Sequence, residues 1–494
     1  MTTKQFNFIK TKAVFPFLLC LFFVLHGFTE NYDFIPVKDA LLLTGLYFFV
    51  TAILIALSWI YFRNIIKASL LAFLIMTYHF FFGAVHDFIK NVSSNGFISK
   101  YSFILSFSAI AFLFLLIAFK KTKNSFSKIN YYLNVLLIIL LIIDSGWLIT
   151  KILKSNKSIT TSLPSEFTNP ENTNRPDVFL IVADEYAGNA ELKDIFDFDN
   201  SLFTDSLKSR NFHTIPYSRS NYNYTPFAIA SLLNMNYLKL ENKERGQTDL
   251  AYCYKLIKQN ALNNFLDQRD YHFYNYSVFD FPGQPAPVNE TFLPVKTRLI
   301  TSQTFLSRLN RDIRFNLITR LKSKSEIKKL TYANLKNNNN IYDLTWKMAE
   351  EKSESPKFVY THLMMPHYPY YFDKNGNELP FEKLGEGNQS NQDAYIEYLQ
   401  YCNKKFLSLI DHILESSSKP PVIVLMGDHG FRHFKKPVEN DYYFLNHVSV
   451  HIPGENNTAF PDSLTTVNLF RTILNREFGQ NLGLLSDSTI YLRD

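Results

Sequence analysis

The sequence predicts a chain of two parts: a bundle of five membrane-spanning helices, then an α/β domain with a central, mostly parallel sheet. Two observations predict this division. Five apolar runs, each close to the roughly 20 residues that cross a bilayer, occupy the first third of the 494 residues. Beyond them, short strand-like runs alternate with helical stretches. We therefore expect a transmembrane domain at 1–151, a linker at 152–175 and a folded domain at 176–494.

Composition excludes several classes of protein. Hydrophobic residues make up 47% and aromatic residues 16% of the chain, which excludes a disordered or collagen-like protein. The 3 cysteines form no disulfide framework; Cys253 and Cys402 can pair outside the cytoplasm, but buried free thiols are the expectation. The net charge of +7 is modest and no nucleic-acid-binding motif is found, so no nucleic-acid partner is expected.

The apolar runs lie at about residues 13–29, 39–62, 65–85, 101–119 and 131–150. The first follows Lys4, Lys10 and Lys12, as a signal peptide would. It lacks a small-residue cleavage site and other spans follow it, so we expect an uncleaved helix. Cys20 is expected to pack in the core and not to be a lipoprotein cysteine, because the apolar run continues beyond it.

Basic residues of the short loops predict the orientation of the bundle. They gather before the first span, between the second and third, and between the fourth and fifth: Lys4, Lys10, Lys12, Arg63, Lys67, Lys120, Lys121, Lys123 and Lys128. If these loops are cytoplasmic, the chain after about residue 151 lies outside the cytoplasm. His79 and Asp144 fall within spans, where ionisable groups are functional candidates, although a helix–helix hydrogen bond explains them equally well.

The second domain is predicted to alternate strands with helices. Strands are expected at 178–183, 212–217, 272–278, 358–363, 422–426 and 448–452, and helices near 201–209, 226–237, 252–267, 341–352 and 393–414. The runs VFLIVA and PVIVLM are almost wholly apolar, as in central strands buried on both faces. The four asparagines at 337–340 are expected to form a loop.

One segment, residues 296–336, is strongly basic. Its cations are Lys296, Arg298, Arg308, Arg311, Arg314, Arg320, Lys322, Lys324, Lys328, Lys329 and Lys336. Two interpretations are open. The segment is a solvated helical face, or it is a surface that faces anionic lipid headgroups, as would suit a domain tethered to a bilayer.

Acidic residues follow two of the apolar strands. VFLIVA is followed by Asp184 and Glu185, and PVIVLMG is followed by Asp428 and His429. Open α/β sheets place their sites at the carboxyl ends of strands, where loops converge. Carboxylates and an imidazole together form a mixed O/N ligand set that suits Zn or Mn. Either pair alone is a weak signal, because acidic residues also cap helices and fill loops.

Thr225 precedes a helix that is expected to begin at Pro226, which makes the threonine its N-cap. A structural cap is the simpler interpretation. The functional interpretation is that the hydroxyl lies where the helix dipole and free N–H groups stabilise negative charge. Beside a divalent metal, such a hydroxyl can ionise and attack phosphorus.

Several histidines are further candidates. His362 lies near a strand end, and His367 follows in an aromatic, proline-bearing loop, where it either packs or contacts a phosphoryl oxygen or a leaving group. His433, His447 and His451 follow the Asp-His pair, and His447 is the preferred member for a supporting role or a second metal.

The motifs PDVFLIVADEY, SNYNYTPFAIASLLNM, THLMMPHYPY and VLMGDHGFR occur in the order seen in the alkaline phosphatase/sulfatase superfamily. Together with the N-terminal spans, the chain resembles the membrane transferase branch, which includes lipoteichoic acid synthases and lipid A phosphoethanolamine transferases. The resemblance implies an alkaline-phosphatase-like fold. It also implies a bacterial-type inner membrane location with the catalytic domain outside the cytoplasm.

The resemblance further implies that Asp184, Thr225, Asp428 and His429 hold a divalent metal, Zn or Mn, and that His367 contacts the phosphate. The transferases usually have Glu where Asp184 stands, so Glu185 supplies the ligand instead or in addition. Sulfatases need a Cys or Ser that is oxidised to formylglycine, with a Pro and an Arg after it; the sequence from Thr225 has neither that residue nor the Arg, which disfavours sulfate-ester hydrolysis.

The expected function is transfer of a phospholipid headgroup, of phosphoethanolamine or phosphoglycerol type, to an envelope glycan or lipid through a phospho-threonine. Two alternatives stay open. The same site can serve a sulfatase-like hydrolase, a phosphodiesterase or sulfuric ester hydrolase, with water as acceptor. The chain can also be a membrane-tethered binding protein without catalysis.

Overall fold

A computed structural model describes residues 8, 10–32, 35–92, 97–155, 167–168, 175–240, 247–288, 297–310, 324–454 and 460–493. It divides into two compact units. Unit 1 contains residues 1–159 and, from much later in the chain, 294–323. Unit 2 contains residues 160–293 and 324–494. The sequence placed 176–494 in one domain, whereas contacts assign the segment 294–323 to the helical unit.

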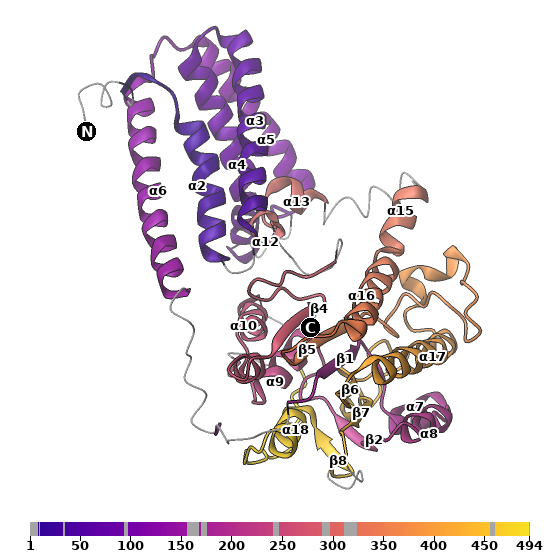
Figure 1. Ribbon diagram of the computed structural model, residues 1–494. Coiled ribbons are helices and arrows are strands. Elements are labelled where there is room, and N and C mark those ends of the chain that lie inside the picture. The colour runs from indigo at the N-terminus through magenta and orange to yellow at the C-terminus, as the bar shows by residue number, and fades with distance from the viewer. Residues whose placement is uncertain are drawn as a thin grey trace. The chain divides into compact units, whose positions relative to one another are not determined.

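Unit 1 is built on long apolar helices (Figure 1). They are α2 Phe15–Glu30, α3 Val37–Phe62, α4 Ile65–Val92, α5 Tyr101–Lys121 and α6 Ser127–Ser155. Of the described helices, 4 are long and apolar enough to cross a membrane, namely α3 to α6. The first expected span, α2, is apolar but has only 16 residues. The expected count of five spans is therefore supported for four of them.

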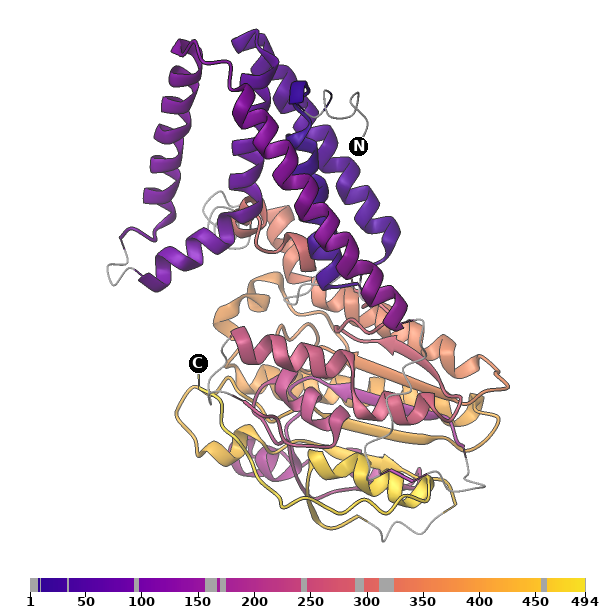
Figure 2. The ribbon, with the colours of Figure 1, turned by 90° about the vertical axis from the view of Figure 1, so that its left-hand side faces the viewer.

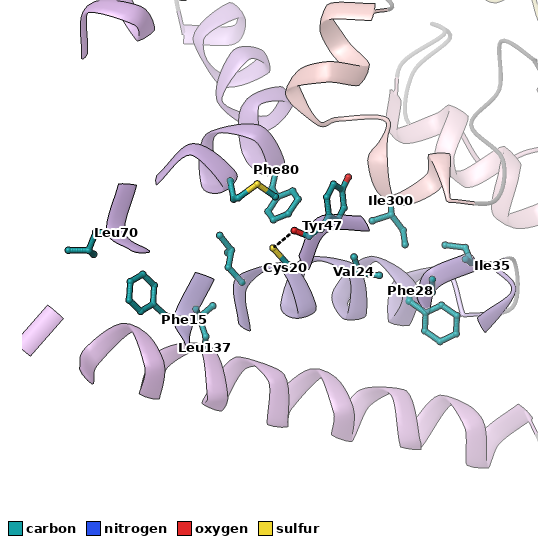
Figure 3. Close-up of a cluster of buried hydrophobic side chains, with 13 residues drawn as sticks. Phe15, Cys20, Val24, Phe28, Ile35, Tyr47, Leu70, Phe80, Leu137 and Ile300 are labelled. Atoms are coloured by element: carbon teal, nitrogen blue, oxygen red, sulfur yellow. Dashed lines mark hydrogen bonds between the residues drawn. The ribbon is translucent and has the colours of Figure 1, made fainter. Parts of the chain in front are cut away.

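The core of the helical unit forms around α2. Phe15, Cys20 and Val24 are almost fully buried there (Figure 3), as expected for Cys20. The three cysteines of the chain are all free and buried, which agrees with the expectation of free thiols. Asp144 of α6 lies 3.2 Å from His26 of α2, so this intramembrane carboxyl takes part in a helix–helix contact.

Two short helices from the later segment, α12 Arg298–Thr301 and α13 Phe305–Leu309, pack in unit 1 beside α2 and α4 (Figure 1). Ile300 is buried in the same core as Phe15 (Figure 3). For residues 297–310, the expectation of a wholly solvated face is wrong, because the segment is too rich in large apolar side chains to remain in water. Much of the remaining basic segment lies outside the described residues.

Unit 2 contains a sheet of 6 strands in the order β2-β7-β6-β1-β5-β4. The strands are β1 Val178–Ala183, β2 Phe212–Thr214, β4 His272–Tyr276, β5 Lys357–Leu363, β6 Val422–Gly427 and β7 Val448–His451. β1 pairs in parallel with both β5 and β6, and β4 pairs in parallel with β5. β7 is antiparallel to its two neighbours. The expected central, mostly parallel sheet is thus present, and every residue of β1 is buried.

Helices flank this sheet (Figure 2). They are α7 Asn189–Phe196, α8 Ser201–Lys208, α9 Thr225–Asn234, α10 Gln247–Lys258, α11 Ala261–Asp267, α15 Lys324–Thr331, α16 Ala333–Glu350, α17 Gln392–Ser416 and α18 Leu469–Glu477. A second sheet pairs β3 Tyr217–Arg219 with β8 Ser463–Thr465, and neither strand was expected as such. The helix expected at 252–267 is two helices, because Asn260 ends one and caps the next by accepting from Asn263 N–H.

The asparagines at 337–340 do not form a loop. They lie inside α16, where Asn337 and Asn338 are buried. Asparagine is a weak helix former, but here tertiary contacts outweigh propensity. The side chain of Asn338 donates to the carbonyl of Met364 at 3.0 Å and accepts from its N–H at 2.8 Å. Most of the expected linker at 152–175 lies outside the described residues, and residues 152–155 are the end of α6.

Candidate metal centre and nucleophile

Three parallel strands end together at one edge of the main sheet. Ala183 at the end of β1 is in register with Leu363 of β5 and with Gly427 of β6. The residues that follow β1 and β6, Asp184 and Asp428, therefore emerge side by side. This is the edge at which ligands bind in open α/β sheets. The position of both acids after buried strands is what the sequence suggested.

A first group of ligand atoms lies at this edge, and we call it the inner cluster: Asp184, His362 and Asp428. One carboxylate or imidazole atom from each lies within 4.8 Å of the others. His362 Nε2 is 3.5 Å from Asp184 Oδ2. The three side chains are almost completely buried. His362 comes from within β5, one residue before its end, so all three members stand on the rigid sheet.

The inner cluster contains buried polar atoms whose partner is not protein. Both carboxylate oxygens of Asp184, Oδ2 of Asp428 and Nε2 of His362 have no hydrogen-bond partner among the described residues. Leaving buried polar atoms unpaired costs about 1–3 kcal/mol each, and more for charged ones. A divalent cation would be bonded by all of them. The donor set of two carboxylates and an imidazole suits Zn or Mn.

The two carboxylates influence each other's ionisation. Burial, together with the charge of Asp184, raises the pKa of Asp428 to about 6. Burial also acts to raise the pKa of Asp184, but the nearby histidines His362, His367 and His429 outweigh it and lower that pKa. Two anions in a dry site repel each other, so the second ionises less readily unless positive charge is added. A cation at the cluster would supply that charge.

Thr225 lies beside these groups at the start of α9. Its Oγ1 is 3.3 Å from His429 Nε2, and the side chain is buried. The expectation that Thr225 is the N-cap is wrong by one residue. Tyr224 is the cap, since its extended backbone carries the carbonyl that accepts from the N–H groups of Phe227 and Ala228. Thr225 is the first helical residue, and its hydroxyl still stands at the positive end of the helix.

Glu185 belongs to a different group, which we call the outer cluster: Glu185, His367 and His433. Their ligand atoms also lie within 4.8 Å of one another. Glu185 is buried, whereas the side chains of His367 and His433 are 18% and 23% exposed. Glu185 has a left-handed backbone with φ of 62°, unusual for a residue with a side chain. This turn directs Asp184 and Glu185, although adjacent, to separate clusters.

Hydrogen bonds to backbone carbonyls set the tautomers of two histidines. The Nδ1 of His429 lies 2.8 Å from the carbonyl of Gly430, and that of His367 lies 2.6 Å from the carbonyl of Tyr368. A carbonyl can only accept, so each Nδ1 carries the proton and each Nε2 faces the site. Burial, with the charge of Arg432, lowers the pKa of His429 to about 3, which keeps it neutral. A neutral Nε2 is the form that binds a metal.

The loop after β6 brings Arg432 to the site. Its N–H donates to Glu185 Oε1 at 2.8 Å, and its guanidinium lies 5.3 Å from the ring centroid of Tyr224. A cation beside the residue that precedes Thr225 can stabilise a phosphoryl group there. Sequence reasoning did not single out Arg432. The only signal was its place four residues after Asp428.

The structure separates the predicted histidines. Asp184, Asp428, His429 and Thr225 come together, while Glu185 and His367 meet in the outer cluster. His362 and His433, which were named only as weaker candidates, each complete one cluster. The preferred candidate His447 lies in neither. Its ring packs on Tyr186, and its Nε2 is 2.9 Å from Ser449 Oγ. His451 lies on β7 with Nδ1 against the carbonyl of Pro421.

Comparisons with known proteins were made by family, sequence and structure. No family model and no curated protein matches the chain. Among solved structures, it is similar to the C-terminal periplasmic domain of EcEptC from Escherichia coli, with 13% identity, coverage of 67% of this chain and 94% of that chain, and a TM-score of 0.42. It is also similar to the lipoteichoic acid synthase LtaP from Listeria monocytogenes, with 12% identity, coverage of 69% and 79%, and a TM-score of 0.39.

A protein in the alkaline phosphatase superfamily from Vibrio parahaemolyticus is similar at 12% identity, with coverage of 67% of this chain and 77% of that chain and a TM-score of 0.38. The third of these structures is described as a member of the superfamily that the motifs resemble. Similarity at this level says nothing about reaction or substrate. Those are inferred below from the chain's own side chains.

Proposed function

We propose that the protein is a membrane-anchored, metal-dependent transferase that moves a phospho-alcohol headgroup from a phospholipid to a hydroxyl of an envelope glycan or lipid. Its catalytic unit would act outside a bacterial-type cytoplasmic membrane. The observation that carries the proposal is the position of Thr225. A buried hydroxyl lies at the positive end of a helix, 3.3 Å from His429 Nε2, next to a cluster of unpartnered buried ligand atoms.

In the first half-reaction, Thr225 Oγ1 forms a bond to phosphorus while the bond from phosphorus to the diacylglycerol oxygen breaks. The hydroxyl proton leaves toward Asp428, whose carboxylate interacts with the Thr225 side chain. His367, in its doubly protonated form, donates the Nε2 proton to the departing oxygen and keeps the Nδ1 proton on the carbonyl of Tyr368. In the second half-reaction, an acceptor hydroxyl forms a bond to the same phosphorus while the bond from phosphorus to Thr225 Oγ1 breaks. The neutral His367 Nε2 takes the acceptor's proton, and Asp428 returns its proton to Thr225 Oγ1.

Asp184, Thr225, Asp428 and His429 would hold the cation, and His362 of the inner cluster would complete the ligand set. When bound there, a divalent cation lowers the pKa of the threonine hydroxyl and neutralises charge on the phosphoryl group. The N–H groups at the start of α9 and the guanidinium of Arg432 stabilise the same charge. The membrane helices fit this chemistry, because they confine the enzyme to the surface that holds a lipid donor.

The mechanism is tested by replacing the nucleophile. Thr225→Ala should abolish release of diacylglycerol from phospholipid vesicles, whereas Thr225→Ser, which keeps a hydroxyl, should retain part of it. Mass spectrometry of the parent protein after incubation with phospholipid should show a mass added at Thr225, and the added mass identifies the group. Release at the parent rate by Thr225→Ala would exclude the covalent route.

The fate of the headgroup distinguishes transfer from hydrolysis. With an acceptor glycan or lipid present, a transferase places the headgroup on the acceptor, and a hydrolase releases it into solution. Metal analysis separates both from a binding protein. Purified full-length protein dialysed against Zn or Mn should retain bound metal, and an empty site after that treatment would contradict the proposed enzyme.

A further inference from the structure

The segment 297–310, which we call the clip, packs against two glycines of the membrane helices. Gly27 of α2 faces Ile300: a Cβ placed on Gly27 would lie 2.8 Å from Ile300 Cγ2. Figure 3 shows Ile300 beside Val24 and Phe28 of α2. Real Cβ atoms do not approach so closely, so this contact requires a residue without a side chain.

Gly83 of α4 makes the second contact. Its N–H donates to the carbonyl of Gln303 at 2.9 Å, and a Cβ on Gly83 would overlap that carbonyl and the Gln303 side chain. The remaining glycines of the described membrane helices differ. A Cβ placed on Gly45 of α3 or on Gly146 of α6 would have no neighbouring atom within 4 Å. The two glycines under the clip therefore form a notch that fits it.

An ion pair also joins the clip to α4. The guanidinium of Arg308, whose side chain is 4% exposed, pairs with Asp87 of α4 and with the side-chain oxygen of Gln303. Phe305 lies edge-on to Phe82 of α4, with ring centroids 5.0 Å apart. Removing the Asp87 carboxylate would leave a buried arginine unpaired in the docked clip, which costs several kcal/mol, so the pair specifies where Arg308 docks.

From these contacts we infer that the clip determines specificity for substrates embedded in a bilayer. The chain enters unit 2 after α6, returns to unit 1 as the clip, and enters unit 2 again. The catalytic unit is thus attached to the membrane unit through more than one chain connection. Each added attachment restricts the volume that the active site samples and raises its effective concentration at the membrane surface. This inference rests on the proposed function.

Leucine substitutions at four glycines of the membrane helices test the inferred role of the clip. Gly27→Leu and Gly83→Leu should displace the clip, whereas Gly45→Leu and Gly146→Leu place the same side chain in open space. Two activities are measured for each full-length protein: diacylglycerol release from vesicles of phosphatidylethanolamine and phosphatidylglycerol, and cleavage of a water-soluble nitrophenyl phosphodiester.

Gly27→Leu and Gly83→Leu should lower the activity on vesicles tenfold or more and leave the activity on the soluble ester within twofold of the parent. Gly45→Leu and Gly146→Leu should match the parent in both activities. Equal loss on both substrates, or no loss on vesicles, overturns the inference. A parent protein that cleaves neither substrate contradicts the proposed function instead. The two failures are therefore distinguishable.

A disulfide tests the docked state independently of protein stability. The Cβ position of Gly27 lies 3.2 Å from Ile300 Cβ, close to the roughly 3.5–4.5 Å of disulfides, so the double variant Gly27→Cys, Ile300→Cys should cross-link on mild oxidation. The natural cysteines are buried and should not compete. The cross-linked protein should keep its activity on vesicles within twofold of its reduced form. Loss of that activity on oxidation, restored by reduction, would show that the clip must release and would overturn the inference.

Discussion

The inner and outer clusters use similar side chains in opposite surroundings. The inner cluster stands on three strands and its members are buried, while the outer cluster draws His367 and His433 from loops and both are partly exposed. Rigid, dry surroundings suit a site that activates a nucleophile, because charges interact most strongly there. Partly open surroundings suit a site that a substrate must enter and leave. The difference predicts a larger effect for each change to the inner cluster.

The largest effect is expected for Asp428→Asn. The amide oxygen can still accept from the N–H groups of Glu185 and His429, which Oδ1 holds at 2.9 and 3.0 Å. The negative charge that binds a cation is lost. Activity on phospholipid should fall by about 1,000-fold or more. The melting temperature of the chelator-treated protein should not fall, because one of two repelling carboxylates is removed. A loss of folding in parallel with activity would contradict this reason.

A smaller effect is expected for His433→Gln in the outer cluster. The histidine is 23% exposed and supports the site from a loop. Activity should fall by about 10- to 100-fold, the range typical of residues that orient or supplement a metal site. Metal content at the inner cluster should be unchanged when measured by elemental analysis. If His433→Gln loses as much activity and as much metal as Asp428→Asn, the two clusters act as one site. That result would contradict the distinction between an inner and an outer cluster.

The loop that carries His367 should respond to Asn338→Ala. The side chain of Asn338 pairs with both backbone groups of Met364, and its loss leaves them buried and unpaired. Stability should fall by about 1–3 kcal/mol, and activity should fall severalfold through displacement of His367. Asn339→Ala is the matched control, because its side chain is exposed on the same helix and should change stability by about 0.5 kcal/mol or less. Equal effects of the two variants would exclude this positioning role.

The smallest effect on activity is expected for Glu191→Gln. Burial raises the pKa of Glu191 well above its usual value of 4.5, although the hydrogen bond from Phe431 N–H opposes this and Glu185 adds to it. Burial therefore favours the neutral carboxyl form in the folded protein, and glutamine resembles that form. The stability from the raised pKa is complete below about pH 4.5 and is lost as the pH rises.

Melting temperatures of the chelator-treated parent and of Glu191→Gln check this from pH 5 to pH 8. The melting temperature of the variant should rise relative to that of the parent as the pH rises, and its activity should change by about twofold or less. A difference that stays constant from pH 5 to pH 8 would mean that Glu191 is already ionised in the fold. In that case Glu191 belongs functionally with the outer cluster.

The sequence revealed the inner cluster better than the outer one, for a physical reason. Asp184 and Asp428 were found because they follow apolar runs, and a run of buried residues predicts both a strand and the place where it ends. His362 was weaker because a polar residue inside a strand has the same pattern whether it faces a site or the solvent. His433 and Arg432 depend on the path of a loop, which local sequence does not determine.

Long-range contacts explain the other differences. The asparagines at 337–340 have the propensity of a loop, and they are helical because Asn338 pairs with a backbone segment 26 residues away. The clip was assigned to the soluble half because two helices of 4 and 5 residues give no membrane signal. Contacts with residues far away in the sequence associate the clip with the bundle: Ile300 and Gln303 fit on two glycines, and Arg308 pairs with Asp87.

The left-handed turn at Glu185 has one more consequence. Because neighbouring residues reach into different clusters, the separation of the two clusters is fixed by a single peptide unit and not by the length of any side chain. Exchanging one ligand for another would change which ion is preferred but would leave that separation intact. The main chain at Glu185 therefore takes part in setting which groups can contact both clusters at once.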